Sequence, residues 1–316
     1  MMLTRVADSL YWIGRYVERA EHTARLADVM LNASLDQSDS AAETALIALA
    51  AVGDPKVAAA RSTPFEAAMD LAFDREGYSS VVTSLALARE NARQMRDQIT
   101  TEMWEQLNAL YLDITGPSSR LAFDQGSSSF LHKIVAGLHL FKGAAEATMS
   151  HGEGWRFLSL GAYLERAQLI TRLLDTAFGE EAQGSPDRDH LVQVSLLRMA
   201  CALEPYLRVY TSDIRPEYIL EFLLFNKEFP RSIRFTTARI EEHAIALSRH
   251  AESPAALAPE RLAGRLSALL EFTDPAEMAK NGAGEILRTV TDECERIHLA
   301  IHESFVAYPI DERLPA

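Results

Sequence analysis

The chain has 316 residues, 48% of them hydrophobic and 24% charged, with a formal net charge of −14 at pH 7. This composition is typical of a folded globular protein, and the negative charge argues against nucleic acid or an anionic membrane as a partner. Cys201 and Cys294 lie far apart without metal-ligand spacing, which excludes a disulfide scaffold and suits a reducing compartment. The N-terminus has no signal sequence and no apolar run approaches the ~20 residues of a membrane span, so we expect a cytoplasmic protein.

Helical signals recur along the whole chain whereas strand signals are nearly absent, so the sequence predicts an all-α fold. Clusters of Gly, Ser, Pro and acidic residues predict linkers at 34–40, 116–126, 179–189 and 250–259. Four segments carry the pattern of a helix capping box, and two of them add proline at the first helical position: Ser40-x-x-Glu43, Thr63-Pro64-x-Glu66, Ser150-x-x-Glu153 and Asp274-Pro275-x-Glu277.

The first predicted element is a long amphipathic helix, because an apolar stripe recurs every three to four residues from Leu3 to Leu31. A similar stripe runs from Phe157 to Phe178. Polar positions recur as well: Gly14, Tyr16, Glu18, Arg19, Arg25 and Asp28 of the first segment match Gly161, Tyr163, Glu165, Arg166, Arg172 and Asp175 of the second. We therefore predict an internally duplicated helical bundle of two similar halves, 1–150 and 151–316, packed as one compact unit.

A second shared element is basic. Its two copies have the same spacing of charges: Arg89-Glu90-x-x-Arg93-x-x-Arg96 and Lys227-Glu228-x-x-Arg231-x-x-Arg234. Pro230 lacks a backbone donor, so we expect it to begin or kink a helix and to place the second copy at a helix N-terminus.

The Glu-Arg pairs are the main candidate site. Neighbouring residues on a helix point about 100° apart, so Glu18 and Arg19 must find partners on other elements, as must Glu165 and Arg166. The expected partners are the two basic elements: Arg89, Arg93 and Arg96, or Lys227, Arg231 and Arg234. The resulting network would carry surplus positive charge and could hold an anionic substrate or a peptide terminus, since arginine forks suit carboxylates and phosphates. The alternative is a purely structural brace.

Two further clusters are polar. In the segment 150–156, the capping pattern accounts for Ser150 and Glu153, which leaves His151 and Trp155 as candidates for a site role. Near the C-terminus, Glu295, His298, His302 and Glu303 share one helical face, but no second Glu-x-x-His pair accompanies them. We interpret this face as solvated and predict no metal and no other cofactor. Phosphate-loop, nucleophile-elbow and Cys-x-x-Cys signatures are missing.

Several of these motifs together resemble the bacterial Alpha-E family, an all-helical domain named for its Glu-Arg motif. They are residues 10–25 (LYWIGRYVERAEHTAR), 88–93 (ARENAR), 102–105 (EMWE), 149–155 (MSHGEGW) and 229–232 (FPRS). The positions that match the family motif are Glu18, Arg19, Glu165 and Arg166. The second copy departs from the usual pattern, because Ala162 stands where the family has arginine, as Arg15 does in the first.

The resemblance implies a protein encoded beside, or fused to, a circularly permuted ATP-grasp protein, often with transglutaminase-like or other peptidase neighbours. ATP-grasp enzymes make amide bonds through acyl phosphates, so the resemblance implies a part in peptide synthesis or modification. It brings no settled catalytic residues.

Three hypotheses of function follow. In the first, the chain is an accessory protein that acts with the ATP-grasp ligase and holds an anionic peptide or acyl-phosphate group on its arginines. In the second, it is itself a transferase or hydrolase in which Glu165 or His151 acts as general base beside Arg166. In the third, the Glu-Arg elements only brace a structural scaffold.

Overall fold

The computed structural model describes residues 4–53, 63–179, 189–249, 257–275, 278 and 282–306. Every regular element in these ranges is a helix, which confirms the all-α prediction. None of the helices in this part of the chain is long and apolar enough to cross a bilayer.

The helices of the first half are α1 (Thr4–Ser34), α2 (Asp39–Val52), α4 (Pro64–Phe73), α5 (Val81–Gln94), α6 (Thr101–Thr115), α7 (Ser119–Gln125) and α8 (Ser127–Thr148). Those of the second half are α9 (Glu153–Phe178), α10 (His190–Met199), α11 (Leu203–Tyr210), α12 (Pro216–Phe225), α13 (Ile233–Ser248), α14 (Leu257–Phe272) and α16 (Gly284–Ile301). A π-helical turn, η3 (His302–Val306), ends the described part.

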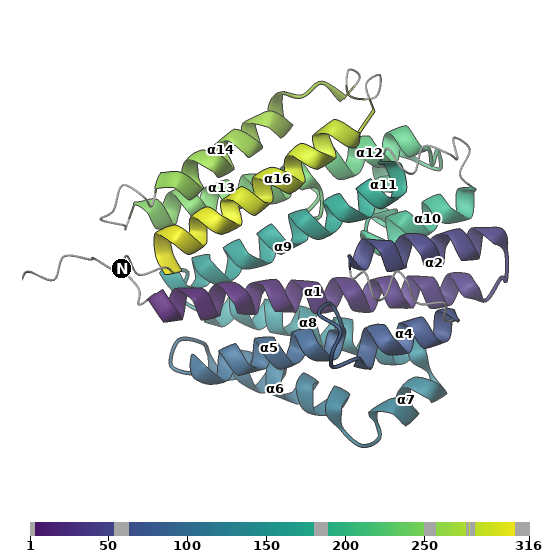
Figure 1. Ribbon diagram of the computed structural model, residues 1–316, viewed down its shortest axis with the longest axis horizontal. Helices are drawn as coiled ribbons and strands as arrows, with labels where there is room; N and C mark the ends of the chain where they lie inside the picture. Colours follow the sequence, from purple (N-terminus) through teal and green to yellow (C-terminus); the bar gives the residue numbers. More distant parts are fainter. Residues whose placement is uncertain are drawn as a thin grey trace, which may run out of the picture.

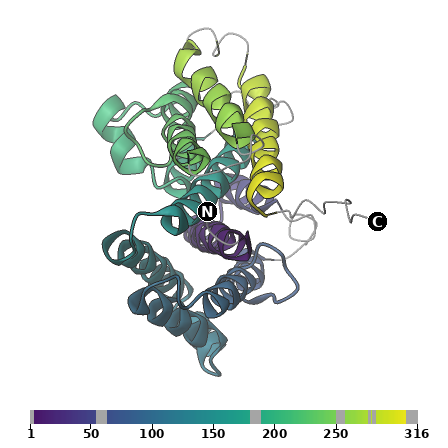
Figure 2. The same cartoon turned by 90° about the vertical axis from the view of Figure 1, so that its left-hand side faces the viewer.

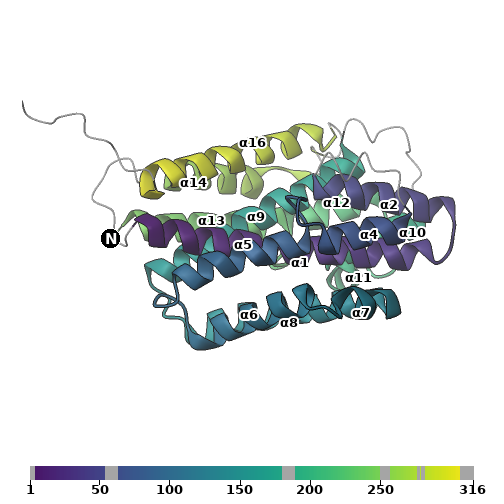
Figure 3. The same cartoon turned by 60° about the horizontal axis from the view of Figure 1, so that its bottom comes forward.

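The α1 and α9 helices form the centre of the bundle (Figure 1). On one side α1 packs against α4, α5 and α8, and on the other side α9 packs against α13 and α16. Figure 2 shows α1 and α9 between these two groups, and Figure 3 shows α6, α7 and α8 as the outer layer below α1. The α1–α9 contact is therefore enclosed by helices of both groups.

Helix α1 is buried on more sides than an amphipathic helix. From Ile13 to Met30, only Tyr16 and Arg25 keep part of their surface accessible. A helix enclosed in this way is normally hydrophobic all round, yet α1 carries charged residues through the same stretch. Buried charges must be paired, so the predicted apolar stripe describes only part of what this helix contacts.

One predicted capping box is formed. Thr63 Oγ1 accepts a hydrogen bond from the Glu66 amide at 3.2 Å, and the Glu66 carboxylate accepts one from the Thr63 amide at 2.9 Å. The patterns beginning at Ser40 and Ser150 form no box, because their helices begin elsewhere: α2 is capped by Ser38, and α9 follows Gly152 without a side-chain cap. The fourth pattern, 274–277, lies partly outside the described residues.

Linker predictions have mixed outcomes. The 34–40 segment does join α1 to α2, but 116–126 contains helix α7, and α14 begins inside the expected 250–259 linker. The 179–189 linker lies mostly outside the described residues. The second basic element lies at a helix N-terminus as expected, because Pro230 and Arg231 directly precede Ser232, the N-cap of α13.

Helices α1 and α9 approach each other closely at two glycines. A Cβ atom on Gly14 would lie 2.0 Å from the Leu158 carbonyl oxygen, and one on Gly161 would lie 2.0 Å from the Tyr11 carbonyl oxygen. The two contacts are reciprocal, as a twofold relation between the predicted repeats would require, although the duplication itself stays a prediction. Only glycine permits this backbone contact at either position.

Gly14→Ala or Gly161→Ala should therefore force the two central helices apart. We expect a loss of about 3 kcal/mol or more and a fall in Tm of more than about 5 °C, measured by thermal unfolding. Gly143→Ala is the matched control, because a Cβ there meets nothing within 4 Å on α8. That control should be neutral or slightly stabilising. Equal melting temperatures for all three variants would contradict the close contact.

Candidate functional site

The two Glu-Arg motifs pair reciprocally between α1 and α9. The Glu18 carboxylate accepts from Arg166 Nε at 2.8 Å and Nη2 at 2.9 Å, while Glu165 accepts from Arg19 Nε at 2.6 Å. Each glutamate thus binds the arginine of the other motif and not its own neighbour. The four motif residues therefore meet one another, whereas the sequence predicted the basic elements as their partners, and both carboxylates are buried.

Around Glu18 the network is closed by further charges, and we call this group the Glu18 cluster. Lys142 on α8 donates to Glu18 at 2.5 Å and also to Glu21, and Arg231 contacts both carboxylates, with 3.3 Å between its Nη1 and Glu18. Arg166 also donates from Nη1 to the Pro230 carbonyl at 3.1 Å. The loop before α13 thus supplies both a cation and a backbone acceptor.

The electrostatics of the Glu18 cluster agree with the structural hypothesis, in which these residues brace the bundle. Burial alone would raise the pKa of Glu18, but Arg166, Lys142 and Arg231 together hold it well below its usual range. The same kind of balance lowers the pKa of Glu21, where Arg231 is the largest opposing charge. Both carboxylates are fully buried and ionised, with their oxygens occupied by cations. No acceptor capacity is left for a ligand.

The Glu165 side of the network opens into a cavity of about 300 Å³, which we call the arginine cavity. It is lined by Trp12, Arg15, Arg19, Gly53, Tyr78, Ser79, Glu165, Gln168, Leu169, Arg172, Glu295 and His298. Glu165 accepts hydrogen bonds from Arg15 Nε and Arg19 Nε, each at 2.6 Å. Burial alone would raise the pKa of Glu165, but these two cations lower it. This carboxylate orients two guanidinium groups side by side.

Positive charge exceeds negative charge around the arginine cavity. Arg19 is 4% exposed, and its Nη1 is buried with no acceptor among the described residues. Arg172 donates from Nη1 to the Val52 carbonyl at 3.2 Å, and its pKa is lowered because loss of water around the guanidinium outweighs the attraction of Glu165. Gly53, at φ 75°, makes room for Arg172, since a Cβ there would lie 2.4 Å from its Nη1.

Aromatic rings support these cations. The Arg19 guanidinium lies 4.3 Å from the centre of the Tyr78 ring, and that of Arg15 lies 5.2 Å from the Trp12 ring. Such contacts stabilise a cation without consuming its hydrogen-bond donors. Arg15 nevertheless donates from Nη1 to Tyr11 at 3.3 Å and from Nη2 to Gln168 at 2.5 Å, so it is Arg19 whose Nη1 stays without an acceptor among the described residues.

The motif near the C-terminus belongs partly to this cavity, which corrects its interpretation as a solvated face. Tyr11 Oη and His298 Nδ1 share a hydrogen bond of 2.8 Å, and both His298 and Glu295 line the cavity. Burial raises the pKa of Tyr11 to about 12 and lowers that of His298 to about 4, so both groups are uncharged at neutral pH. His298 is thus an uncharged part of the cavity lining, and Tyr11 joins it to Arg15, which donates from Nη1 to Tyr11 Oη at 3.3 Å.

Several predicted site residues lie outside the network. In the first basic element, Arg89 donates to Asn108 at 2.8 Å and Arg93 pairs with Glu90 at 2.8 Å, while Arg96 packs over Trp104. Helix α5 turns these side chains toward α6 or solvent. Of the second basic element only Arg231 reaches the network, because Arg234 pairs with Glu271 on α14 at 3.4 Å.

The other predicted candidates, His151 and Trp155, pack on each other. Their rings are stacked with centroids 4.0 Å apart, and His151 Nε2 lies 3.0 Å from the Glu146 carbonyl oxygen. Trp155 also meets His243 edge-on at 5.2 Å. None of these rings touches the Glu-Arg network through a contact given by the described residues, so His151 does not lie beside Arg166 as the enzyme hypothesis required.

Sequence reasoning missed residues that matter here. Glu21 and Gln168 could have been found, because they occupy matching positions of the two motifs. Glu21 completes the closed Glu18 cluster. Gln168 is neutral and accepts a hydrogen bond from Arg15 Nη2 at 2.5 Å beside the cavity. Arg172 carried a similar signal as the counterpart of Arg25. Lys142 and Tyr78 lie outside both repeated elements, and no pattern pointed to them.

Glu18→Gln should leave Arg166, Lys142 and Arg231 facing each other without their shared counter-charge. We expect a loss of about 3–5 kcal/mol, measured by denaturant unfolding, because breaking a buried ion pair strands its partners. Glu90→Gln removes an exposed carboxylate that also pairs with arginine, and this control should leave the unfolding midpoint unchanged. Similar midpoints for both variants would show that the Glu18 cluster does not brace the bundle.

His22 gives the network a dependence on pH. The ring is 1% exposed, neither nitrogen has a partner among the described residues, and burial together with Arg231 lowers its pKa to about 3. The unfolded chain binds a proton on His22 near pH 6.5, whereas the folded chain does not. The uncharged ring therefore costs no stability above that pH, and the folded protein loses stability as the pH falls below it.

We therefore expect His22→Leu to reduce the stability lost between pH 7 and pH 5 by about 2 kcal/mol, measured by denaturant unfolding at both pH values. Replacing the exposed His190 with Gln should leave the wild-type difference between the two pH values intact. An unaltered pH dependence in His22→Leu would mean that this imidazole becomes protonated within the folded protein.

Comparison with known proteins agrees with the motifs. Residues 2–306 match Alpha-E, described as a predicted alpha-helical domain with a conserved ER motif. Uncharacterized proteins of Mycobacterium bovis and Mycobacterium tuberculosis are 25% and 24% identical over 325 residues, which cover 95% of this chain and 36% of each relative. The chain thus spans about a third of the length of these relatives. No solved structure matches it. Since the match covers nearly the whole chain, and since the glutamate and arginine of each motif meet at its centre, the protein belongs to the Alpha-E family.

Proposed function

We propose that this chain is an anion-binding accessory protein that works with an ATP-grasp amide or peptide ligase in the cytoplasm. In this proposal the arginine cavity holds the carboxylate, phosphate or acyl-phosphate group of the ligase's substrate or product. The observation that carries it is the guanidinium of Arg19, which lines a cavity together with Arg15 and Arg172 and whose buried Nη1 has no acceptor among the described residues.

The geometry favours a small acid group. Glu165 takes the Nε of Arg15 and of Arg19, so it fixes both guanidiniums and leaves Nη1 of Arg19 to donate to a ligand. Hydrogen bonds between guanidinium and carboxylate or phosphate are charge-assisted, and they strengthen where water is excluded. A volume of about 300 Å³ is at the lower end of ligand pockets, which suits one acid group and its neighbouring atoms.

Burial of an unpaired donor is costly, which is why the cavity is a better candidate than the brace. A buried donor without a partner costs about 1–3 kcal/mol and is expected where a ligand supplies the acceptor. Among the described residues, the cations of the Glu18 cluster, Lys142, Arg166 and Arg231, have no such unpaired buried nitrogen. The structural hypothesis therefore fits one side of the network and the binding hypothesis fits the other.

A role for Glu165 as general base is disfavoured by the same contacts. Arg15 and Arg19 lower the pKa of this carboxylate despite its burial, and a base that holds two cations accepts a proton poorly near pH 7. Arg166 is engaged with Glu18 on the other side of the network. An accessory role needs no base at this position.

The ligase partner is inferred from the family resemblance. The mycobacterial relatives are longer than this chain, which agrees with a domain that can work joined to other domains. A cavity for an acid group also suits amide-bond formation through acyl phosphates, because both the acid and its phosphorylated form are anions. Nothing in the proposal requires the chain to turn over a substrate alone.

Binding can be tested with phosphate, acetyl phosphate and glutarate as probes. We expect at least one of them to raise Tm with a concentration dependence that follows ligand linkage. Arg172→Gln should weaken that binding by about tenfold or more, since it removes a guanidinium from the cavity wall. Arg96→Gln, which removes an arginine outside the network, should bind like wild type. No binding of any probe, or equal binding by both variants, would contradict the site.

Reconstitution tests the partnership. The ATP-grasp protein encoded beside or fused to the chain should release ADP and form product faster when the chain is present, and Arg172→Gln should reduce this gain. Product mass and ADP release are measured together. An unchanged rate and an unchanged product with wild-type chain would remove the accessory role, even if the cavity binds acids.

A further inference from the structure

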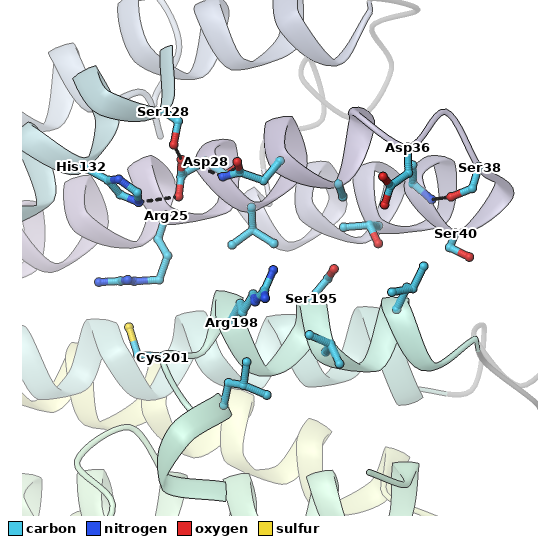
Figure 4. A pocket seen from close by; sticks show the side chains of 18 of the residues that line it. Arg25, Asp28, Asp36, Ser38, Ser40, Ser128, His132, Ser195, Arg198 and Cys201 are labelled. Atoms are coloured by element: carbon cyan, nitrogen blue, oxygen red, sulfur yellow. Dashed lines mark hydrogen bonds and ion pairs between the residues drawn. The ribbon is translucent and has the colours of Figure 1, made fainter. Parts of the chain in front are cut away.

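A second and larger cavity lies between α1 and α2 on one side and α10 on the other. Its volume is about 580 Å³, and it shares no lining residue with the arginine cavity. In Figure 4, Arg25 and Cys201 lie toward one end and Asp36, Ser38 and Ser40 toward the other, with Arg198 and Ser195 between them. We call it the Cys201 cavity.

We propose that the Cys201 cavity binds a short peptide whose carboxylate and amino group are both free, with the carboxylate held by Arg25 and Arg198 and the ammonium group by Asp36. This site goes beyond the proposed function, because it lies elsewhere and recognises a ligand of different charge. Three observations on the lining carry it.

The first observation is the pair of arginines. Arg25 donates from Nη2 to Glu21 at 3.0 Å, which fixes its guanidinium, while its Nε is buried with no acceptor among the described residues. Arg198, across the cavity on α10, has no acidic partner in the described part of the chain. Two guanidiniums with donors to spare match the fork geometry of a carboxylate.

The second observation is the balance of charge. Acidic residues also line the cavity, namely Asp28, Asp36 and Glu204, so the two arginines produce no surplus of positive charge. Polyphosphates and other dense anions would meet repulsion here, unlike in the arginine cavity. A ligand that carries one charge of each sign fits this lining.

The third observation is how those acids are engaged. Asp28 is already satisfied, because Ser128 donates to its Oδ1 at 2.6 Å and His132 Nε2 lies 2.9 Å from its Oδ2. Asp36, at the far end, has no side-chain partner among the described residues. Asp189, which accepts from Ser40, adds a second carboxylate near that end. Asp36 therefore lies at the opposite end of the cavity from Arg25, with Arg198 between them.

The walls between the two ends suit a peptide body. Val29 and Ala33 on α1 face Leu191 and Val194 on α10 as apolar surfaces, while Thr44 and Ser195 offer hydroxyl groups. Pockets of this size enclose most of a ligand of several residues, and apolar walls with a few polar groups are typical of them. Fixed charges at both ends would favour peptides whose two termini are spaced so that each reaches one end.

The chain contains a natural reporter for occupancy. Cys201 lines the cavity and is partly accessible, whereas Cys294, the other cysteine, is 0% exposed. Alkylation by iodoacetamide should therefore modify Cys201 first, and a bound peptide should shield it. Burial raises the pKa of the Cys201 thiol, so the rate is followed at mildly alkaline pH by intact mass spectrometry.

The experiment compares pools of apolar tripeptides on the full chain. A pool with free termini should slow Cys201 alkylation by about tenfold at saturation, since the ligand fills the same cavity as the thiol. The same pool with amidated C-termini, or with acetylated N-termini, should protect much less. Arg198→Gln should lose protection by the free pool, its rate with peptide being compared with the rate of the same variant without peptide, whereas Arg208→Gln, on the neighbouring α11, should keep protection.

Several outcomes would overturn the proposal. They are absence of protection by the free pool, equal protection by the amidated pool, and protection by pyrophosphate in place of peptide, which would make this an anion site. The readout does not depend on the arginine cavity, because Cys201 reports only on its own site. Loss of acid binding in the arginine cavity can thus be distinguished from loss of peptide protection in the Cys201 cavity.

Discussion

The contact between α1 and α9 determines both the fold and the site. Two glycines let the helix backbones meet, and this closeness lets Glu18 reach Arg166 and Glu165 reach Arg19 with short side-chain hydrogen bonds. With a larger residue at either glycine the helices would separate, and four buried charges would lose their partners. Removing these charges from water costs free energy, and the folded protein tolerates this cost only because both ion pairs form together.

The two sides of this contact differ in charge at two pairs of matching positions. The chain has Glu21 and Gln168 at one pair, and Arg15 and Ala162 at the other. The extra carboxylate of Glu21 allows Lys142 and Arg231 to be neutralised inside the bundle, whereas the neutral Gln168 leaves Arg15 and Arg19 with Glu165 as the acid they share. A closed brace and a cationic cavity thus arise from similar helices.

Much of this could be predicted from the sequence. Periodicity identified the long helices, and the repeated Glu-Arg motif identified four residues that do meet. Spacing alone could not separate Arg231 from Arg89 or Arg234, because which face of a helix packs inward depends on neighbours that are distant in sequence. Lys142 lies on α8 and contacts the network only because of tertiary packing. The capping patterns at Ser40 and Ser150 form no box because α2 and α9 begin at other residues.

Because Glu18 has an arginine partner on α9, the buried charges of α1 cannot all be paired until α9 has been synthesised. While the ribosome is still making the first half, α1 already carries Glu18, Glu21 and Arg19, yet Arg166 and Arg231 do not exist. A truncated first half would have to keep these charges in water, so its central helix could not settle into a dry interior. The first of the two predicted halves therefore depends on α9 to pair the buried charges of its central helix.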